Sequence, residues 1–78
     1  MAGTTPLRIG ILGAADIARQ FAKAVAASPL VRVAAVASRS QDKADAFARA
    51  HGIARAFGSY EAMLADRDID AVYNPLPN

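Results

Sequence analysis

Short apolar runs alternate along the whole chain with stretches whose apolar residues recur at helical spacing. The first run is Leu7–Leu12, and the second is Val31–Ala37, which is apolar at nearly every position. Continuous apolar runs of this kind are typical of parallel strands covered on both faces. Two weaker runs follow at 54–57 and 70–74, with a helical pattern before each. The alternation therefore predicts an α/β fold with parallel strands and right-handed crossovers.

Apolar spacing and capping residues predict three helices between these strands. The first spans residues 16–27 and ends before a Ser-Pro pair, because the residue before a proline is disfavoured in the α region. The second begins after Ser40, a suitable N-cap, and ends at Gly52, which suits the left-handed position after a helix. Ser59 can cap the third helix, over 60–65. The order β-α-β-α-β-α-β predicts a partial Rossmann, doubly wound sheet of strand order 3-2-1-4 in αβα layers.

The composition argues against several classes of function. The net charge is only +2, and lysine and arginine are scattered rather than gathered in a basic stripe, so we expect no nucleic-acid partner. No run approaches the roughly 18 apolar residues of a membrane helix, so we expect no membrane association. The chain has no cysteine, which removes disulfides and thiolate metal ligands and favours a cytoplasmic location. We also expect no metal site.

The stretch "GILGAADIAR" has the spacing of a dinucleotide fingerprint between a strand and a helix. Gly13 keeps the first glycine of G-x-G-x-x-G, while Ala15 and Ala18 replace the other two with the smallest available side chain. Free N–H groups at the start of the helix can bind a diphosphate. The alternative is an ordinary strand-to-helix turn. The candidate pyrophosphate-binding residues are Gly13, Ala14, Ala15, Asp16 and Ile17.

The end of the second strand favours NADP over NAD. An NAD site usually has a carboxylate here for the ribose 2′-hydroxyl, but no carboxylate occurs between Asp16 and Asp42. Ser38, Arg39 and Ser40 stand there instead, with Lys43 one turn into the next helix. Hydroxyls and cations beside a helix N-terminus suit a phosphomonoester such as a ribose 2′-phosphate. The alternative is a solvated loop with an N-cap serine.

Three stretches together resemble the N-terminal part of the glucose–fructose oxidoreductase, inositol dehydrogenase and MocA (Gfo/Idh/MocA) family. They are "GILGAADIA", "VAAVASRSQDKADAFARAHGI" and "SYEAMLADRDIDAVYNPLPN", of which "DAVYNPLPN" is the most specific. The resemblance implies an NAD(P)-dependent oxidoreductase that acts on sugars, polyols or related diols. It also implies a Rossmann domain followed by a separate substrate domain, so residues 1–78 would be the N-terminal portion of the Rossmann domain.

The resemblance assigns roles residue by residue. The segment Gly13–Ile17 resembles the pyrophosphate turn, and Ser38, Arg39 and Lys43 resemble the 2′-phosphate site. The family's catalytic lysine, in a Glu-Lys-Pro motif after the next strand, has no counterpart here, so no catalytic residue is assigned. The residues that resemble the loop beside the cofactor's ribose and diphosphate are Leu76, Pro77 and Asn78.

Two other functions stay open at this point: a non-catalytic dinucleotide sensor, and a folding fragment without activity. We also expect self-association, because a strand at 70–74 would lie at the edge of a 3-2-1-4 sheet with unpaired backbone groups. The single histidine, His51, is interpreted as structural at a helix C-terminus. The acidic run Asp66, Asp68 and Asp70 is interpreted as a solvated connection, since the glycine and distal glutamate of a Ca²⁺ loop are absent.

Overall fold

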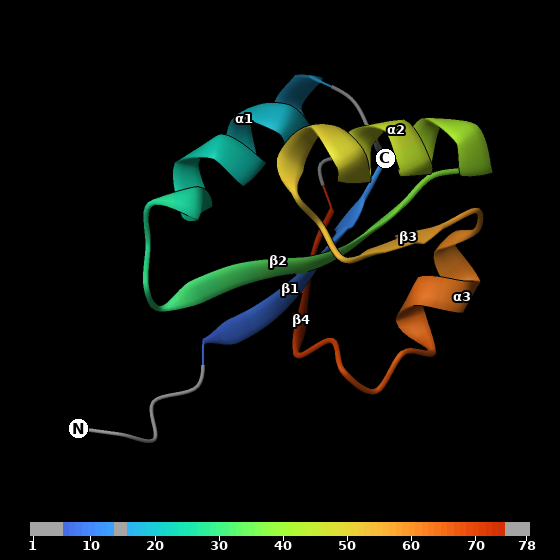
Figure 1. Ribbon diagram of the computed structural model, residues 1–78. Helices are drawn as coiled ribbons and strands as arrows, with labels where there is room; N and C mark the ends of the chain where they lie inside the picture. Colours follow the sequence, from blue (N-terminus) through green and yellow to red (C-terminus); the bar gives the residue numbers. More distant parts are fainter. Residues whose placement is uncertain (1–5, 14–15, 75–78) are drawn as a thin grey trace.

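The computed structural model describes residues 6–13 and 16–74, whose elements follow the predicted order (Figure 1). Every boundary lies within one residue of the predicted one. The strands are β1 (Leu7–Leu12), β2 (Val31–Ala37), β3 (Arg55–Phe57) and β4 (Ala71–Tyr73), and the helices are α1 (Asp16–Ala26), α2 (Gln41–His51) and α3 (Tyr60–Leu64).

The four strands form one parallel sheet in the order β3-β2-β1-β4, so the predicted strand order is confirmed. The pairing of β1 with β2 is regular except at one step. Ile9 lies opposite Val33, but Gly10 lies opposite Ala35, so β2 carries one extra residue, Ala34. This irregularity is a β-bulge.

The helices cover both faces of the sheet, as the three-layer prediction requires. Figure 1 shows α1 and α2 on one face and α3 on the other. Two clusters of buried side chains fill the two spaces. The cluster under α1 and α2 is Ile11, Ala18, Ala22, Val36, Phe47, Ala48 and Ile53, and the cluster under α3 is Leu12, Ala35, Ala37 and Met63.

The predicted capping residues hold the ends of the helices. The Ser40 hydroxyl accepts the N–H of Lys43 at 3.3 Å, and the Ser59 hydroxyl accepts the N–H of Ala62 at 3.2 Å. Gly52 ends α2 with φ 65° and donates its N–H to a carbonyl in the last turn of the helix. Each contact satisfies a backbone group that the helix itself leaves unpaired.

Glycine at position 10 lets α3 approach the centre of the sheet. A Cβ at Gly10 would lie 2.8 Å from Sδ of Met63 and 3.2 Å from a methyl carbon of Ile69. The Met63 side chain is fully buried. The small residue on β1 therefore makes room for the fully buried side chain of α3.

The edge strand β4 is attached to its neighbours at both ends. At its carboxyl end, Tyr73 stacks on Phe21 of α1, with ring centroids 3.9 Å apart and planes 8° from parallel. Before its amino end, Asp70 pairs with Arg8 of β1. Asp66 and Asp68 in the preceding connection pair with Arg55 of β3. Asp66, Asp68 and Asp70 thus form an ion-pair network with Arg8 of β1 and Arg55 of β3, the two strands on either side of β2.

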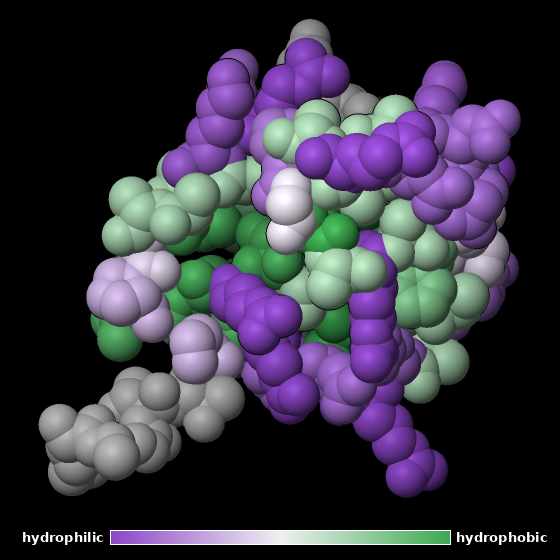
Figure 2. Space-filling model, viewed as in Figure 1, coloured by the Kyte–Doolittle hydropathy of each residue, from purple (hydrophilic) through white to green (hydrophobic). Residues whose placement is uncertain are grey.

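Figure 2 shows apolar side chains in a hollow between α1 and the sheet, with hydrophilic side chains around it. The hollow has a volume of about 170 Å³. Its lining is Ala22, Val25, Ala26, Val31, Arg32, Val33, His51 and Ile53. His51 contacts Phe47, with ring centroids 4.5 Å apart.

Candidate functional site

The turns after β1, β2 and β3 meet at the carboxyl edge of the sheet. Gly13, which follows β1, donates its N–H to the carbonyl of Ala37 at 2.7 Å. Ser38, which follows β2, donates its N–H to the carbonyl of Phe57 at 3.0 Å. These two bonds continue the ladders of the sheet past the strands. They place Gly13 beside the end of β2, and Ser38 beside the end of β3.

Gly13 has φ 94°, a backbone conformation that side-chain-bearing residues rarely adopt. This positive φ turns the chain from the end of β1 into α1, which begins at Asp16, with Ile17 in its first turn. The other residues predicted for the pyrophosphate and ribose contacts, Ala14, Ala15, Leu76, Pro77 and Asn78, lie outside the described residues.

Ser38 and Ser40 shape the turn after β2. Ser38 is only 8% exposed, and its hydroxyl oxygen accepts the N–H of Ser40 at 3.2 Å. The Ser40 hydroxyl in turn caps α2. Both oxygens therefore hold the backbone on either side of Arg39. The Ser38 hydroxyl thus supports the turn, and its burial leaves little of it open to a ligand.

Arg39 and Lys43 flank the end of β2 on opposite layers. The exposed guanidinium of Arg39 lies over the ring of Tyr60, with Cζ 5.9 Å from the ring centroid, on the α3 side. The exposed side chain of Lys43 lines a groove of about 240 Å³ that it shares with Arg19 of α1. Both cations are exposed and lie close in sequence to the end of β2, one on each side of the turn's N-cap residue, Ser40.

Sequence reasoning missed Tyr60 and Gln41 as parts of this site. Tyr60 begins α3, and the Gln41 amide donates to the carbonyl of Ala56 at 3.2 Å, which joins the start of α2 to β3. The predicted strand order could have indicated that residues from these two turns lie close together. The third strand ends at the same sheet edge as the second, so the residues that follow it belong near Arg39.

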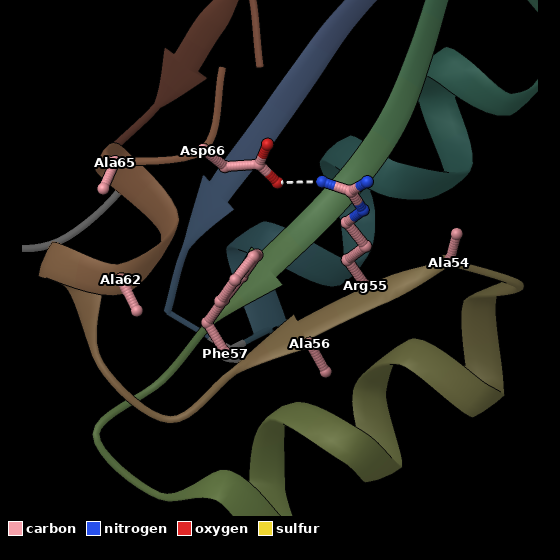
Figure 3. A pocket seen from close by; sticks show the side chains of 7 residues that line it. All are labelled: Ala54, Arg55, Ala56, Phe57, Ala62, Ala65 and Asp66. Carbon is pink, nitrogen blue, oxygen red and sulfur yellow. Dashed lines mark hydrogen bonds and ion pairs between the residues drawn. The ribbon is translucent and has the colours of Figure 1, made fainter. Parts of the chain in front are cut away.

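A second pocket lies away from this edge, between β3 and α3 (Figure 3). Its volume is about 530 Å³, and alanine side chains form much of its wall. Figure 3 shows Arg55 and Asp66 directed toward one another across it and joined by an ion pair. The hydrogen bond from Arg55 holds the pKa of the Asp66 carboxyl below its ordinary value. Because its two charged groups neutralise each other, this pocket offers a ligand little polar recognition.

Within 6–13 and 16–74, no group of three or more histidine, aspartate or glutamate side chains is placed to hold a metal ion. Over the same residues, no helix is long and apolar enough to span a membrane.

Residues 7–78 match the family model described as "Oxidoreductase family, NAD-binding Rossmann fold", the Gfo/Idh/MocA family. The chain belongs to this family. The resemblance carried by the sequence motifs is therefore confirmed, and the Gfo/Idh/MocA fold accounts for the parallel 3-2-1-4 sheet.

Relatives within the family include enzymes that act on sugars. The chain is 56% identical over 72 residues to dTDP-3,4-didehydro-2,6-dideoxy-alpha-D-glucose 3-reductase of Streptomyces violaceoruber, covering 91% of this chain and 21% of that protein. It is 51% identical to D-xylose 1-dehydrogenase (NADP(+)) 2 of Haloferax volcanii, covering 92% and 22% respectively. The chain thus spans about a fifth of the length of these relatives.

Solved structures agree with this assignment. A 3-ketoreductase from Actinomadura kijaniata, crystallised in complex with NADP, matches with a TM-score of 0.87 at 44% identity, covering 94% of this chain and 23% of that one. Among the described residues, Gly13 supplies a turn of positive φ after β1, and Arg39 presents an exposed cation after β2.

Proposed function

We propose that these 78 residues are the N-terminal portion of an NADP-binding Rossmann domain in an oxidoreductase that acts on sugars, polyols or related diols. The observation that carries the proposal is the turn after β2. It presents an exposed arginine, Arg39, between two hydrogen-bonded serines, and no carboxylate occupies the position that an NAD site uses. The names of the Haloferax and Actinomadura relatives, which mention NADP, support the same choice.

Two turns would bind different parts of the cofactor. The turn from Gly13 to Ile17 would hold the pyrophosphate on the first N–H groups of α1. Arg39 and Lys43 would bind the 2′-phosphate from its two sides, on the backbone that Ser38 shapes. Leu76, Pro77 and Asn78 would pass beside the ribose and diphosphate. The nicotinamide supplies the hydride chemistry when bound, while these residues bind and orient the opposite end of the cofactor.

A titration with NADP and with NAD tests this proposal. We expect the 78-residue chain to bind NADP more tightly than NAD. Arg39→Asp should weaken NADP binding by about 2–3 kcal/mol, because a charge-assisted contact is replaced by repulsion. Arg49→Asp, at another exposed arginine in the last turn of α2, is the matched control and should leave the preference unchanged. Equal affinity of the wild-type chain for the two dinucleotides would overturn the proposal.

The isolated chain should bind nucleotide without turning over substrate. The family resemblance places the catalytic lysine after a further strand, and hydride transfer needs a group that moves the substrate proton. Incubation with NADP and a panel of sugars and polyols should therefore give no NADPH absorbance. NADPH formation by a preparation shown to be free of host dehydrogenases would contradict this expectation.

The free edge of β4 supports a proposal of self-association. β4 pairs with β1 on one side, and among the described residues no strand pairs with its other side. Val72 on this strand is 40% exposed, so an apolar side chain adjoins the unpaired backbone. Sedimentation at micromolar concentration should show dimers that Val72→Lys disperses. A monomeric wild-type chain would contradict this, and so would dimers that the lysine variant leaves intact.

A cytoplasmic location completes the proposal. It rests on the cysteine-free sequence, which a reducing compartment permits, and on the dinucleotide that the site is built to bind.

A further inference from the structure

The ring of Tyr60 has a fixed position beside the end of β2. It is half-buried and packs against the cluster under α3, which contains Leu12, Ala37 and Met63. Ser59 caps the helix that Tyr60 begins, so the backbone at this point is held as well. One face of the ring meets the guanidinium of Arg39. Tyr60 is therefore anchored in the core and contacts the site at the same time.

The turn that carries Tyr60 is tied to the start of α2. The Gln41 amide nitrogen donates to the carbonyl of Ala56 at 3.2 Å and to the Asp45 carboxylate at 2.9 Å. Gly58 lies so close that a Cβ there would be 2.7 Å from Oε1 of Gln41. These contacts hold the start of α2 against β3 and the turn that leads to Tyr60.

Arg39 is held at both ends of its side chain. On the backbone side, the hydrogen bond from the Ser40 N–H to the Ser38 hydroxyl spans the residue. At the far end, Cζ lies 5.9 Å from the centroid of the Tyr60 ring, within the range of about 6 Å over which a ring face attracts a cation. An exposed arginine otherwise samples many rotamers, and ordering them on binding costs free energy.

We infer that Tyr60 is a positioning residue that orients the Arg39 guanidinium for a ribose 2′-phosphate. This inference rests on the proposed NADP site and deepens it. The ring restricts where the guanidinium lies before nucleotide arrives, and the paired donors of an arginine bind a phosphate best when they are already in place. Tyr60 acts through Arg39 and contributes to the choice between NADP and NAD rather than to nucleotide binding in general.

Titrations with NADP and NAD on a double-variant cycle test the inference. Tyr60→Met keeps an apolar side chain in the core but removes the ring, and it should weaken NADP binding about two- to fivefold while NAD binding stays constant. Tyr60→Phe keeps the ring and should restore wild-type affinity. In an Arg39→Ala background, Tyr60→Met should have no further effect. A loss shared equally by both dinucleotides, or one that persists without Arg39, would show a merely structural role and overturn the inference.

A measurement without nucleotide separates this inference from the proposed function. In the NMR spectrum of the wild-type chain, we expect nuclear Overhauser contacts between the Arg39 side chain and the Tyr60 ring. We also expect upfield-shifted Arg39 δ-protons that return toward ordinary values in Tyr60→Met. If NADP and NAD bind equally, the proposed function fails while these contacts remain. If the contacts and shifts are absent, Tyr60 does not position Arg39, whatever the chain binds.

Discussion

Arg8 and Asp70 are joined by four hydrogen bonds across the amino ends of two neighbouring strands. The Arg8 backbone N–H and its Nε both donate to one carboxylate oxygen, at 2.9 and 3.1 Å, and a terminal guanidinium nitrogen donates to the other at 3.1 Å. The Asp70 N–H returns a bond to the Arg8 carbonyl at 2.8 Å. The pair fixes the start of β4 against β1. Through the neighbouring Asp68, which contacts both arginines, it connects with Arg55 on β3.

This network predicts that the chain loses stability in acid. Hydrogen bonds from Arg8 and Arg55 hold the pKa values of Asp70 and Asp66 below the ordinary 3.8. A carboxyl whose pKa is lower in the folded state stabilises the fold above its unfolded pKa, and it loses this contribution as the pH falls through the folded value. The free energy of urea unfolding should therefore drop below about pH 4.

The variant Asp70→Asn identifies the source of that acid sensitivity. Its stability deficit relative to wild type should be present at pH 7 and should shrink as the pH falls through 4 toward 2, because the wild-type carboxyl is then neutral as well. Added salt should reduce the deficit, since the pair is exposed to solvent. Glu61→Gln, an exposed acid on α3, is the control. A deficit for Asp70→Asn that does not change with pH would show that the charge is irrelevant.

The stack between Phe21 and Tyr73 should stabilise the attachment of α1 to the edge strand. We expect a coupling free energy of about 0.5–1.5 kcal/mol from a double-variant cycle of Phe21→Leu and Tyr73→Leu, measured by urea unfolding. The coupling arises because either single substitution already breaks the stack, so the double variant does not lose the stacking free energy a second time. Additive effects of the two substitutions would mean that the rings contribute by burial alone.

Gly10→Ala should destabilise the chain by about 1–3 kcal/mol through overpacking. The added methyl group would lie 2.8 Å from Sδ of Met63 and 3.2 Å from Ile69, so the fully buried Met63 side chain would have to shift within the core. The gain in strand propensity from replacing glycine is smaller than this cost. Met63→Val in the same background should recover part of the loss. A stabilised Gly10→Ala chain in thermal or urea unfolding would show that α3 can shift away from the sheet.

Gly13→Ala should reduce stability by about 1–3 kcal/mol and also weaken NADP binding, because its φ of 94° is strained for any residue with a Cβ. Gly52→Ala is the matched control. Gly52 has φ 65° with no atom within 4 Å of an added Cβ, so it bears only the backbone cost of about 1–2 kcal/mol. The affinity for NADP, measured on the folded fraction of each variant, should fall for Gly13→Ala but not for Gly52→Ala. Equal nucleotide affinity of the two variants would remove Gly13 from the site.

Local patterns in the sequence predicted the capping serines and the glycine turn, because each depends on residues close together in the chain. The strand order followed from the alternation of strands and helices through the general rules for parallel sheets. Relationships across the sheet were not predictable in this way. The partners of Arg8 and Arg55 lie in a connection that the sequence marks only as acidic, and the contact of Arg39 with Tyr60 depends on how two turns approach one another. Serine is a residue type that often binds ligands, but the Ser38 hydroxyl accepts a hydrogen bond from the Ser40 N–H within the turn itself. The placements of Ala14, Ala15 and Leu76–Asn78 stay predictions.

The extra residue in β2 has a consequence for the site some distance along the strand. Side chains alternate between the faces of a strand, so one inserted residue reverses the alternation for everything that follows it. Val33 and Val36 both pack under α1 and α2 although they are three residues apart, and Ala35 and Ala37 pack under α3. The same reversal sets which way the residues after Ala37 face. Deletion of one residue, or of any odd number of residues, within β2 would exchange the orientations of Ser38 and Arg39. The surface turn at 27–30 could change length without affecting them. The number of residues between the bulge and Arg39 therefore fixes which side of the sheet the arginine side chain faces.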